Sequence, residues 1–210
     1  MEIVDADSFE EYYSLFWENI FEKEAAFWYG DDKRGYPQIE GFLKVFAIID
    51  GFFDPQKNVF NDLSAEYKNK LDTFKTQEEL QAFLNLFKEY ADLWFEWGSL
   101  EAQGKGFEDF ECRLFQIVHL TELSLLPLIL KLKYVLKNKR DELKNVCDLF
   151  SGILCQTYIN TSMIPTTNAE YLQLMKNLDE NAPFHYLKNH FANKRKAQPA
   201  KKTVVKRVFR

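Results

Sequence analysis

Apolar side chains recur every three or four positions along most of the chain, the spacing that places them on one face of an α-helix. The clearest segment begins at Thr76, because Thr76-Gln77-Glu78-Glu79 matches a capping box and an apolar stripe then runs from Leu80 to Trp94. Similar capping boxes begin at Ser8 and Thr167. No segment alternates with a period of two for long enough to form a strand, so the pattern predicts an all-α protein.

Capping residues, glycines and prolines delimit the predicted helices. A short helix is expected over about residues 63–74. The longer helices are expected over residues 9–29, 38–50, 77–97, 107–120, 125–138, 140–160, 168–178 and 183–193. The longer helices give the expected fold, an irregular bundle of about eight helices.

Glycines at 98, 104 and 106 interrupt the middle of the chain and predict a boundary between two helical subdomains. The N-terminal subdomain would cover residues 1–97. The C-terminal subdomain would cover residues 107–193 and pack on the first as one unit. Residues 194–210 are predicted to be a flexible, basic tail.

The composition is that of a globular protein, with 46% hydrophobic and 28% charged residues among 210. Aromatic side chains are abundant, at 20 Phe, 10 Tyr and 4 Trp. Large rings bury much apolar area each, so they can stabilise irregular helix packing. The core is therefore expected to be rich in aromatic residues.

Targeting and redox signals favour the cytoplasm. The first residues are acidic and lack the pattern of a signal peptide, and no apolar run approaches the roughly 20 residues that span a bilayer. The three cysteines are odd in number and show no C-x-x-C spacing, which is typical of free thiols in a reducing compartment. We expect a cytoplasmic protein without membrane contact.

Catalytic and metal-binding motifs are not found in the sequence. There is no H-E-x-x-H, no phosphate-binding glycine loop and no G-x-S-x-G, and His185 and His190 would lie about 140° apart on a helix. Carboxylate pairs such as Asp109 and Glu111 are expected in first helical turns at the surface. We predict no catalytic, cofactor-binding or metal-binding residues, and an enzyme with scattered site residues is the least favoured interpretation.

Charge is distributed unevenly along the chain. Residues 1–193 contain 19 basic and 32 acidic residues, for a net charge of −13, whereas residues 194–210 carry +8. Such a tail could neutralise nucleic-acid phosphates, or it could be solvated or docked on the acidic body. The candidate nucleic-acid-binding residues are Lys194, Arg195, Lys196, Lys201, Lys202, Lys206, Arg207 and Arg210.

Three neighbouring aromatic residues, Trp94, Phe95 and Trp97, form a second candidate site. They lie at the end of the longest predicted helix. Core packing is the simpler interpretation of such a cluster, and an exposed interface patch is the alternative.

The order of these segments resembles the helical region of GmrSD-type modification-dependent restriction proteins. The resemblance covers about residues 8–178 and depends on order more than on an invariant signature. Phe42-Leu43-Lys44-Val45-Phe46 resembles the FL-x-x-F helix of that family, and Phe87-Lys88-Glu89-Tyr90-Ala91 is similar to its L-x-x-YA segment. The other similar segments are Phe16 to Phe21, Tyr67-Lys68, the box at Thr76, Phe115 to Leu130, and Asp148 to Asn168.

The departures from this family limit what the resemblance implies. The D-G-Q-Q-R motif of its nucleotide-hydrolysing domain and the H-N-H nuclease motif are absent, and Leu154-Cys155-Gln156 stands where a basic pair is usual. The resemblance implies a non-catalytic helical module of a restriction or phage-defence system, which binds a partner subunit or DNA. The alternative is a stand-alone interaction or scaffold protein that self-associates.

Overall fold

The computed structural model describes residues 10–31, 37–55, 62–121, 123–159 and 167–197. These residues form ten helices and a short 3-10 turn, and they contain no β-strand. The all-α class is therefore confirmed, and the expected count of about eight helices is slightly low.

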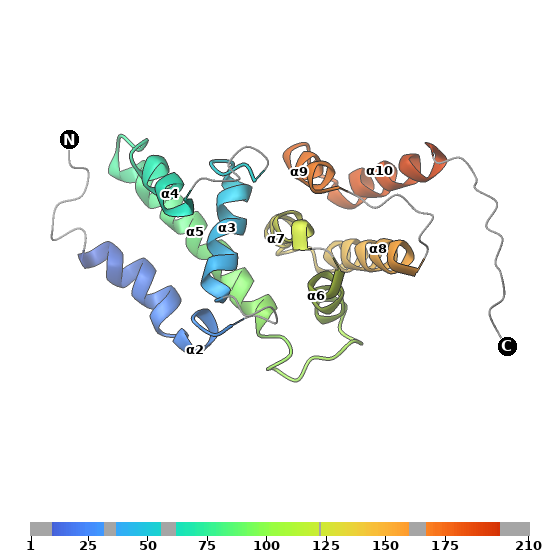
Figure 1. Ribbon diagram of the computed structural model, residues 1–210, viewed down its shortest axis with the longest axis horizontal. Coiled ribbons are helices and arrows are strands. Elements are labelled where there is room, and N and C mark those ends of the chain that lie inside the picture. The colour runs from blue at the N-terminus through green and yellow to red at the C-terminus, as the bar shows by residue number, and fades with distance from the viewer. Residues whose placement is uncertain (1–9, 32–36, 56–61, 122, 160–166, 198–210) are drawn as a thin grey trace.

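The first half of the chain forms a group of helices at the left of Figure 1. Its elements are η1 (Tyr13–Glu22), α2 (Ala25–Trp28), α3 (Gln38–Asp50), α4 (Leu63–Leu71) and α5 (Gln77–Gly98). Both η1 and α3 pack against α5, which is the longest helix of the group. The predicted stop of α3 is confirmed, because Gly51 follows Asp50 with a φ of 88°, a left-handed conformation that glycine adopts without steric cost.

The second half of the chain extends to the right in Figure 1, with α8 and α10 along the long axis. Its elements are α6 (Phe110–Thr121), η2 (Leu123–Leu125), α7 (Leu126–Val135), α8 (Arg140–Ile159), α9 (Asn168–Lys176) and α10 (Pro183–Ala197). Helix α7 contacts α3 and α5 on one side and α9 on the other. Seven of its ten residues are buried, as expected for a helix that is surrounded by protein.

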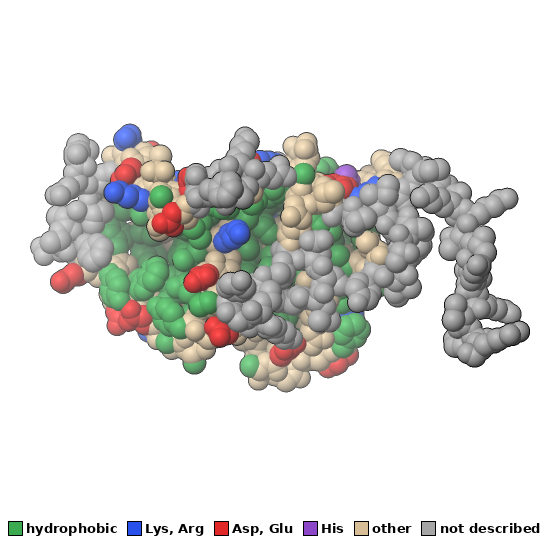
Figure 2. All heavy atoms as spheres, viewed as in Figure 1, with side chains coloured by type: hydrophobic (Ala, Val, Ile, Leu, Met, Phe, Trp, Pro, Cys, Tyr) green, Lys and Arg blue, Asp and Glu red, His purple; other side chains and the backbone are tan. Residues whose placement is uncertain are grey.

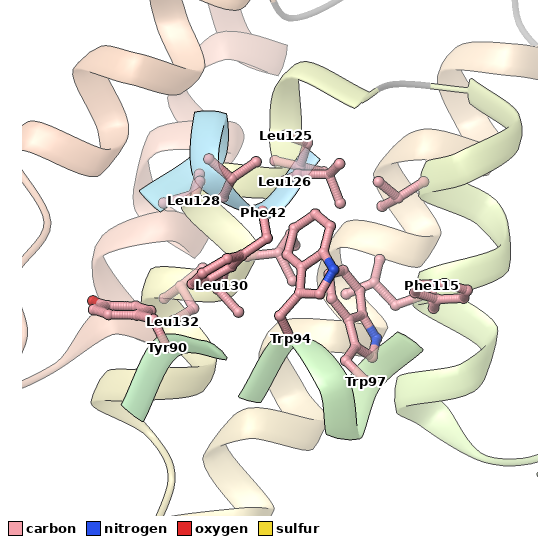
Figure 3. Close-up of a cluster of buried hydrophobic side chains, with 14 of the residues drawn as sticks. Phe42, Tyr90, Trp94, Trp97, Phe115, Leu125, Leu126, Leu128, Leu130 and Leu132 are labelled. Carbon is pink, nitrogen blue, oxygen red and sulfur yellow. The ribbon is translucent and has the colours of Figure 1, made fainter. Parts of the chain in front are cut away.

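Aromatic rings from several helices fill the core of the first half. Phe42 of α3 is fully buried, and its ring lies 5.1 Å from that of Phe87, 5.5 Å from Trp28 and 6.0 Å from Trp94. Figure 3 shows the leucines of α7 packed beside this cluster. One continuous set of buried residues includes side chains from both halves, so the two halves share a core within the described residues.

The capping box at the start of α5 is confirmed. The Thr76 hydroxyl accepts a hydrogen bond from the Glu79 backbone N–H at 3.2 Å, and the Glu79 carboxylate accepts one from the Thr76 N–H at 3.4 Å. At α9 the Thr167 hydroxyl caps the Glu170 N–H at 3.2 Å, but the Glu170 carboxylate binds α10 instead. Ser8, which begins the first predicted box, lies outside the described residues.

Replacement of Thr76 by alanine removes one arm of this capping box. We expect the free energy of unfolding to fall by about 1 kcal/mol, because the Glu79 N–H loses its intramolecular acceptor. Urea denaturation followed by circular dichroism measures the change. Thr76→Ser keeps the hydroxyl and should remain within about 0.5 kcal/mol of the parent protein, and equal losses in both variants would contradict the proposed role of the cap.

The N-terminal helix differs from the prediction of one α-helix over residues 9–29. The chain forms a π-helix, η1, and then a separate short helix, α2. The wider winding is visible in the bond from the Lys23 N–H to the Glu18 carbonyl, five residues earlier, at 3.2 Å. As a result Phe16, Ile20 and Phe21 are buried, whereas Tyr13, which an α-helical repeat places on the buried face, is exposed.

Candidate interaction surface

The first residues of the predicted basic tail are helical. Helix α10 continues to Ala197, so Lys194, Arg195 and Lys196 belong to the helix. The Lys194 ammonium lies 2.6 Å from a Glu170 carboxylate oxygen, and His190 Nε2 lies 2.8 Å from the other oxygen. Five further candidate cations lie outside the described residues: Lys201, Lys202, Lys206, Arg207 and Arg210.

Glu170 therefore joins α9 to α10. Burial tends to raise the pKa of its carboxyl, but hydrogen bonds and charge attraction from Lys194 and His190 outweigh that effect and lower the pKa. The carboxylate thus stays charged near neutral pH and holds Lys194 against the protein. An ammonium engaged in this way is less available to nucleic-acid phosphates than a solvated lysine, so α10 offers a weaker phosphate site than its sequence indicates.

The aromatic cluster at the end of α5 belongs mainly to the core. Trp94 and Trp97 are buried, and their indole N–H groups donate hydrogen bonds to the Gln38 side chain at 3.3 Å and to the Glu111 carbonyl at 3.2 Å. Phe95 is half-buried, with its ring 4.9 Å from that of Phe27. The core interpretation therefore holds, and the interface alternative is wrong for the two tryptophans.

Glu111 and Lys133 form a buried ion pair between α6 and α7. The Lys133 side chain is 4% exposed and that of Glu111 is 9% exposed. The expectation that the Asp109 and Glu111 pair lies at the surface is wrong for Glu111, which is buried and paired with Lys133 of α7. Asp109 does cap the first turn, accepting bonds from the N–H groups of Glu111 at 3.0 Å and Cys112 at 3.1 Å.

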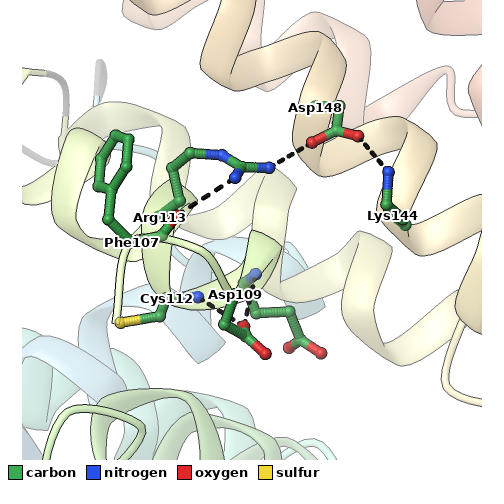
Figure 4. Close-up of polar contacts among 7 residues, drawn as sticks. Phe107, Asp109, Cys112, Arg113, Lys144 and Asp148 are labelled. Atoms are coloured by element: carbon green, nitrogen blue, oxygen red, sulfur yellow. Dashed lines mark hydrogen bonds and ion pairs between the residues drawn. The ribbon is translucent and has the colours of Figure 1, made fainter. Parts of the chain in front are cut away.

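A second group of charges joins α6 to α8, as Figure 4 shows. Asp148 accepts a bond from Arg113 at 2.5 Å and one from Lys144 at 2.8 Å. Burial tends to raise the pKa of the Asp148 carboxyl, but the two cations lower it overall. Arg113 also donates to the Phe107 carbonyl at 3.2 Å. Each of these polar groups already has a protein partner, which is typical of a structural network.

The three cysteines differ in accessibility. Cys112 and Cys147 are buried, whereas Cys155 is exposed. Burial, with a smaller contribution from the charge of Glu111, raises the pKa of the Cys147 thiol to about 12. Because the thiolate is the nucleophile, Cys147 should be inert in the folded protein.

We expect a thiol reagent at mildly alkaline pH to label Cys155 rapidly in the native protein and to leave Cys112 and Cys147 unmodified. Denaturation should expose all three thiols to the reagent. Mass spectrometry of digested protein identifies the labelled positions, and Cys155→Ser is the control that should remove the rapid phase. Rapid labelling of Cys147 in the native protein would show that this thiol is accessible and not buried.

A pocket of about 240 Å³ lies between α3, α5 and α7. Its lining residues are Phe46, Ile49, Asp50, Leu86, Tyr90, Lys131, Tyr134 and Glu180. The charges at its wall are matched, since Lys70 lies 2.8 Å from Asp50 and Lys131 lies 3.2 Å from Glu180. Burial raises the pKa of the Tyr90 hydroxyl, which therefore remains protonated. This pocket has neither the size nor the unpaired charge typical of an active site.

The largest unexplained feature is a group of exposed apolar side chains near the start of the described chain. Six large hydrophobic residues are exposed in the described ranges, and four of them lie between residues 13 and 29. These are Tyr13, Leu15, Trp17 and Tyr29, at 42%, 47%, 37% and 49% exposure. Figure 2 shows hydrophobic side chains gathered over η1 and α2 with acidic side chains at the edge of the group.

Tyr13, Trp17 and Tyr29, with Glu18 and Glu22, define what we call the η1 surface. The Tyr13 hydroxyl donates a hydrogen bond to Glu22, which lies two turns of the π-helix further along. This bond raises the pKa of Tyr13, and the nearby Tyr29 and Glu18 add to the shift. Trp17 packs on the buried Phe21 ring at 4.7 Å. The surface therefore combines exposed aromatic rings with two carboxylates.

The charges around the η1 surface are predominantly negative. Residues 10–31 contain six carboxylates and one lysine, Lys23. Glu18 accepts a hydrogen bond from the Ser14 hydroxyl at 2.9 Å, and Glu22 accepts one from Tyr13. Within the described ranges, neither carboxylate forms an ion pair with a lysine or arginine. The sequence does show aromatic and acidic residues close together in this segment. The assumed α-helical repeat, however, assigned Tyr13 to the core.

The described residues offer no group of three histidine, cysteine or carboxylate side chains that could hold a metal ion. None of the helices in these ranges has the length and apolar character needed to cross a membrane. In comparisons with known proteins, no family model, curated protein or solved structure matches the chain.

Proposed function

We propose that this chain is a non-catalytic helical module that binds another protein chain through the η1 surface. The observation that carries the proposal is the concentration of exposed Tyr13, Trp17 and Tyr29 on one short stretch of the chain. Tyrosine and tryptophan are enriched at protein interfaces, because a rigid ring contributes a large contact area and a polar group. Singly exposed apolar residues are ordinary, but a group of them at one site supports an interaction surface.

A protein partner fits this surface better than a nucleic acid does. Glu18 and Glu22 would repel phosphates, and the surrounding residues 10–31 are strongly acidic. The candidate DNA-binding cations lie on α10 or beyond it, and Lys194 is held by Glu170. The resemblance to GmrSD-type proteins supports a partner subunit of a restriction or phage-defence system as the setting. A stand-alone scaffold role is the alternative.

Site-specific photo-crosslinking tests the proposed function. We would place p-benzoylphenylalanine at Tyr29 in the cells that produce the protein, irradiate them and identify adducts by mass spectrometry. Tyr29 is suitable because its side chain is exposed while its neighbour Trp28 is buried. The proposal predicts one discrete protein adduct at Tyr29, whose partner also binds the purified chain.

A matched position controls for random collision. Asp92 on α5 has an exposed side chain, and the same crosslinker there should give no discrete adduct. Equal adducts at both positions, or none at Tyr29, would count against the η1 surface as an interface.

A further inference from the structure

We propose that the η1 surface binds residues 198–210 of a second copy of the chain. This inference depends on the proposed function, because it names the occupant of the same surface. The segment reads Gln-Pro-Ala-Lys-Lys-Thr-Val-Val-Lys-Arg-Val-Phe-Arg. It combines basic residues with apolar ones, as a ligand for an aromatic and acidic surface should.

The charges of the two segments are complementary. Residues 198–210 contain five lysines or arginines and no acid, whereas residues 10–31 carry six carboxylates and one lysine. Opposite charges favour encounter and fix the register of an interface. Lysine and arginine also bind the faces of aromatic rings, so Tyr13, Trp17 and Tyr29 can contact cations as well as the apolar Val208 and Phe209.

Several carboxylates elsewhere on the described surface are already paired with a lysine or arginine. Glu89 pairs with Lys137 at 2.8 Å, and Asp92 pairs with Lys88 at 2.7 Å. Similar pairs join Asp50 to Lys70, Asp148 to Arg113 and Lys144, Glu170 to Lys194, and Glu180 to Lys131. Glu18 and Glu22 differ, because within the described ranges they accept hydrogen bonds from hydroxyl groups only. Their negative charges are therefore not balanced by a lysine or arginine of the described residues, and they can pair with cations of another chain.

The positions of the two elements favour a second copy over the same chain. In Figure 1, η1 lies at the left end of the long axis and α10 extends toward the right end. Residue 198 follows the last residue of α10, Ala197. A contact within one chain would have to extend along the length of the molecule, whereas a second copy can present its segment directly. The resulting contact is head-to-tail, the type that adds successive copies unless the arrangement closes into a ring.

Sedimentation of the full chain tests this proposal. The weight-average mass should rise with protein concentration at about 0.05 M salt and fall toward that of one chain at about 0.5 M salt, because exposed charge pairs are screened. Deletion of residues 198–210 should abolish the rise. So should Glu18→Lys/Glu22→Lys, which reverses the charge of the acceptor surface.

A matched variant controls for the change in net charge. Asp92→Lys/Glu108→Lys reverses two exposed carboxylates outside the η1 surface and should leave the association unchanged. Circular dichroism confirms that each variant is folded. If both double variants reduce association equally, or if the deletion leaves it intact, the proposed contact is wrong.

A direct binding measurement identifies the occupant. A synthetic peptide of residues 198–210, titrated into the chain that lacks them, should change the emission of Trp17, the one tryptophan that is exposed. Glu18→Lys/Glu22→Lys should weaken this binding by about tenfold or more, as expected for the loss of close charge pairs. A peptide with glutamine in place of its five basic residues should not bind.

Two outcomes separate this inference from the proposed function. A Tyr29 crosslink to a different protein, with no effect of residues 198–210 on sedimentation, would leave the interface in place and overturn the occupant. If the peptide binds a short DNA duplex but not the η1 surface, the segment is a nucleic-acid-binding element and the proposed contact is again wrong.

Discussion

Replacement of Lys133 by methionine is expected to lower the free energy of unfolding by about 3–5 kcal/mol. The variant leaves the Glu111 carboxylate in the core without its partner, where water cannot solvate it. That loss is a large share of the roughly 5–15 kcal/mol by which proteins of this kind are stable. Urea denaturation followed by circular dichroism measures the effect.

The double variant Glu111→Leu/Lys133→Met separates the cost of an unpaired charge from the contribution of the pair. Because it removes both charges, it should recover most of the stability that Lys133→Met loses. If the double variant is less stable than the single one, the packing of the two side chains matters more for stability than the pairing of their charges. If Lys133→Met alone has no effect, the pair is not buried in solution.

Replacement of Phe42 by alanine is expected to cost about 3–5 kcal/mol of unfolding free energy. The Phe42 ring is fully buried among rings from η1, α2, α3 and α5, so its removal leaves a cavity that the surrounding rings cannot fill. Chemical denaturation, with tryptophan emission as the signal, measures the loss because Trp28 and Trp94 lie beside Phe42.

Tyr29→Ala is the matched control for Phe42→Ala. It also removes an aromatic ring from the N-terminal half, but Tyr29 is 49% exposed. Its removal should change stability by no more than about 0.5 kcal/mol. Equal losses in the two variants would contradict the assignment of Phe42 to the core and of Tyr29 to the surface.

Helices with strong local signals were predictable from the sequence. Thr76 and Glu79 specify the start of α5 by themselves, and the apolar stripe then determines which face is buried. The π-helical winding of η1 was not predictable in this way. Phe16 and Ile20 are four residues apart and fit an α-helix as well as a π-helix, so the burial of Phe21 and the exposure of Tyr13 depend on packing against the rest of the fold.

The surroundings of individual charged and aromatic side chains were less predictable than the fold. Glu111 and Lys133 are 22 residues apart, and neither carries a local signal that it will meet the other inside the protein. The same reason applies to Lys194, whose partner Glu170 lies on a different helix. Trp94 was recognisable as a core residue from its place on the apolar stripe of α5, and core packing was the simpler interpretation for Trp97 beside it. The exposure of Trp17, in contrast, required the geometry of η1.

The central position of α7 has a consequence for how the molecule unfolds. Since α7 packs on α3, α5 and α9, neither half can lose its structure without uncovering apolar surface on the other. All four tryptophans lie at or before residue 97, so their emission reports on the first half, whereas circular dichroism reports on helices in both. Superimposable denaturation curves from the two signals would indicate one cooperative unit. Separate midpoints would reveal two independently melting subdomains despite their shared core.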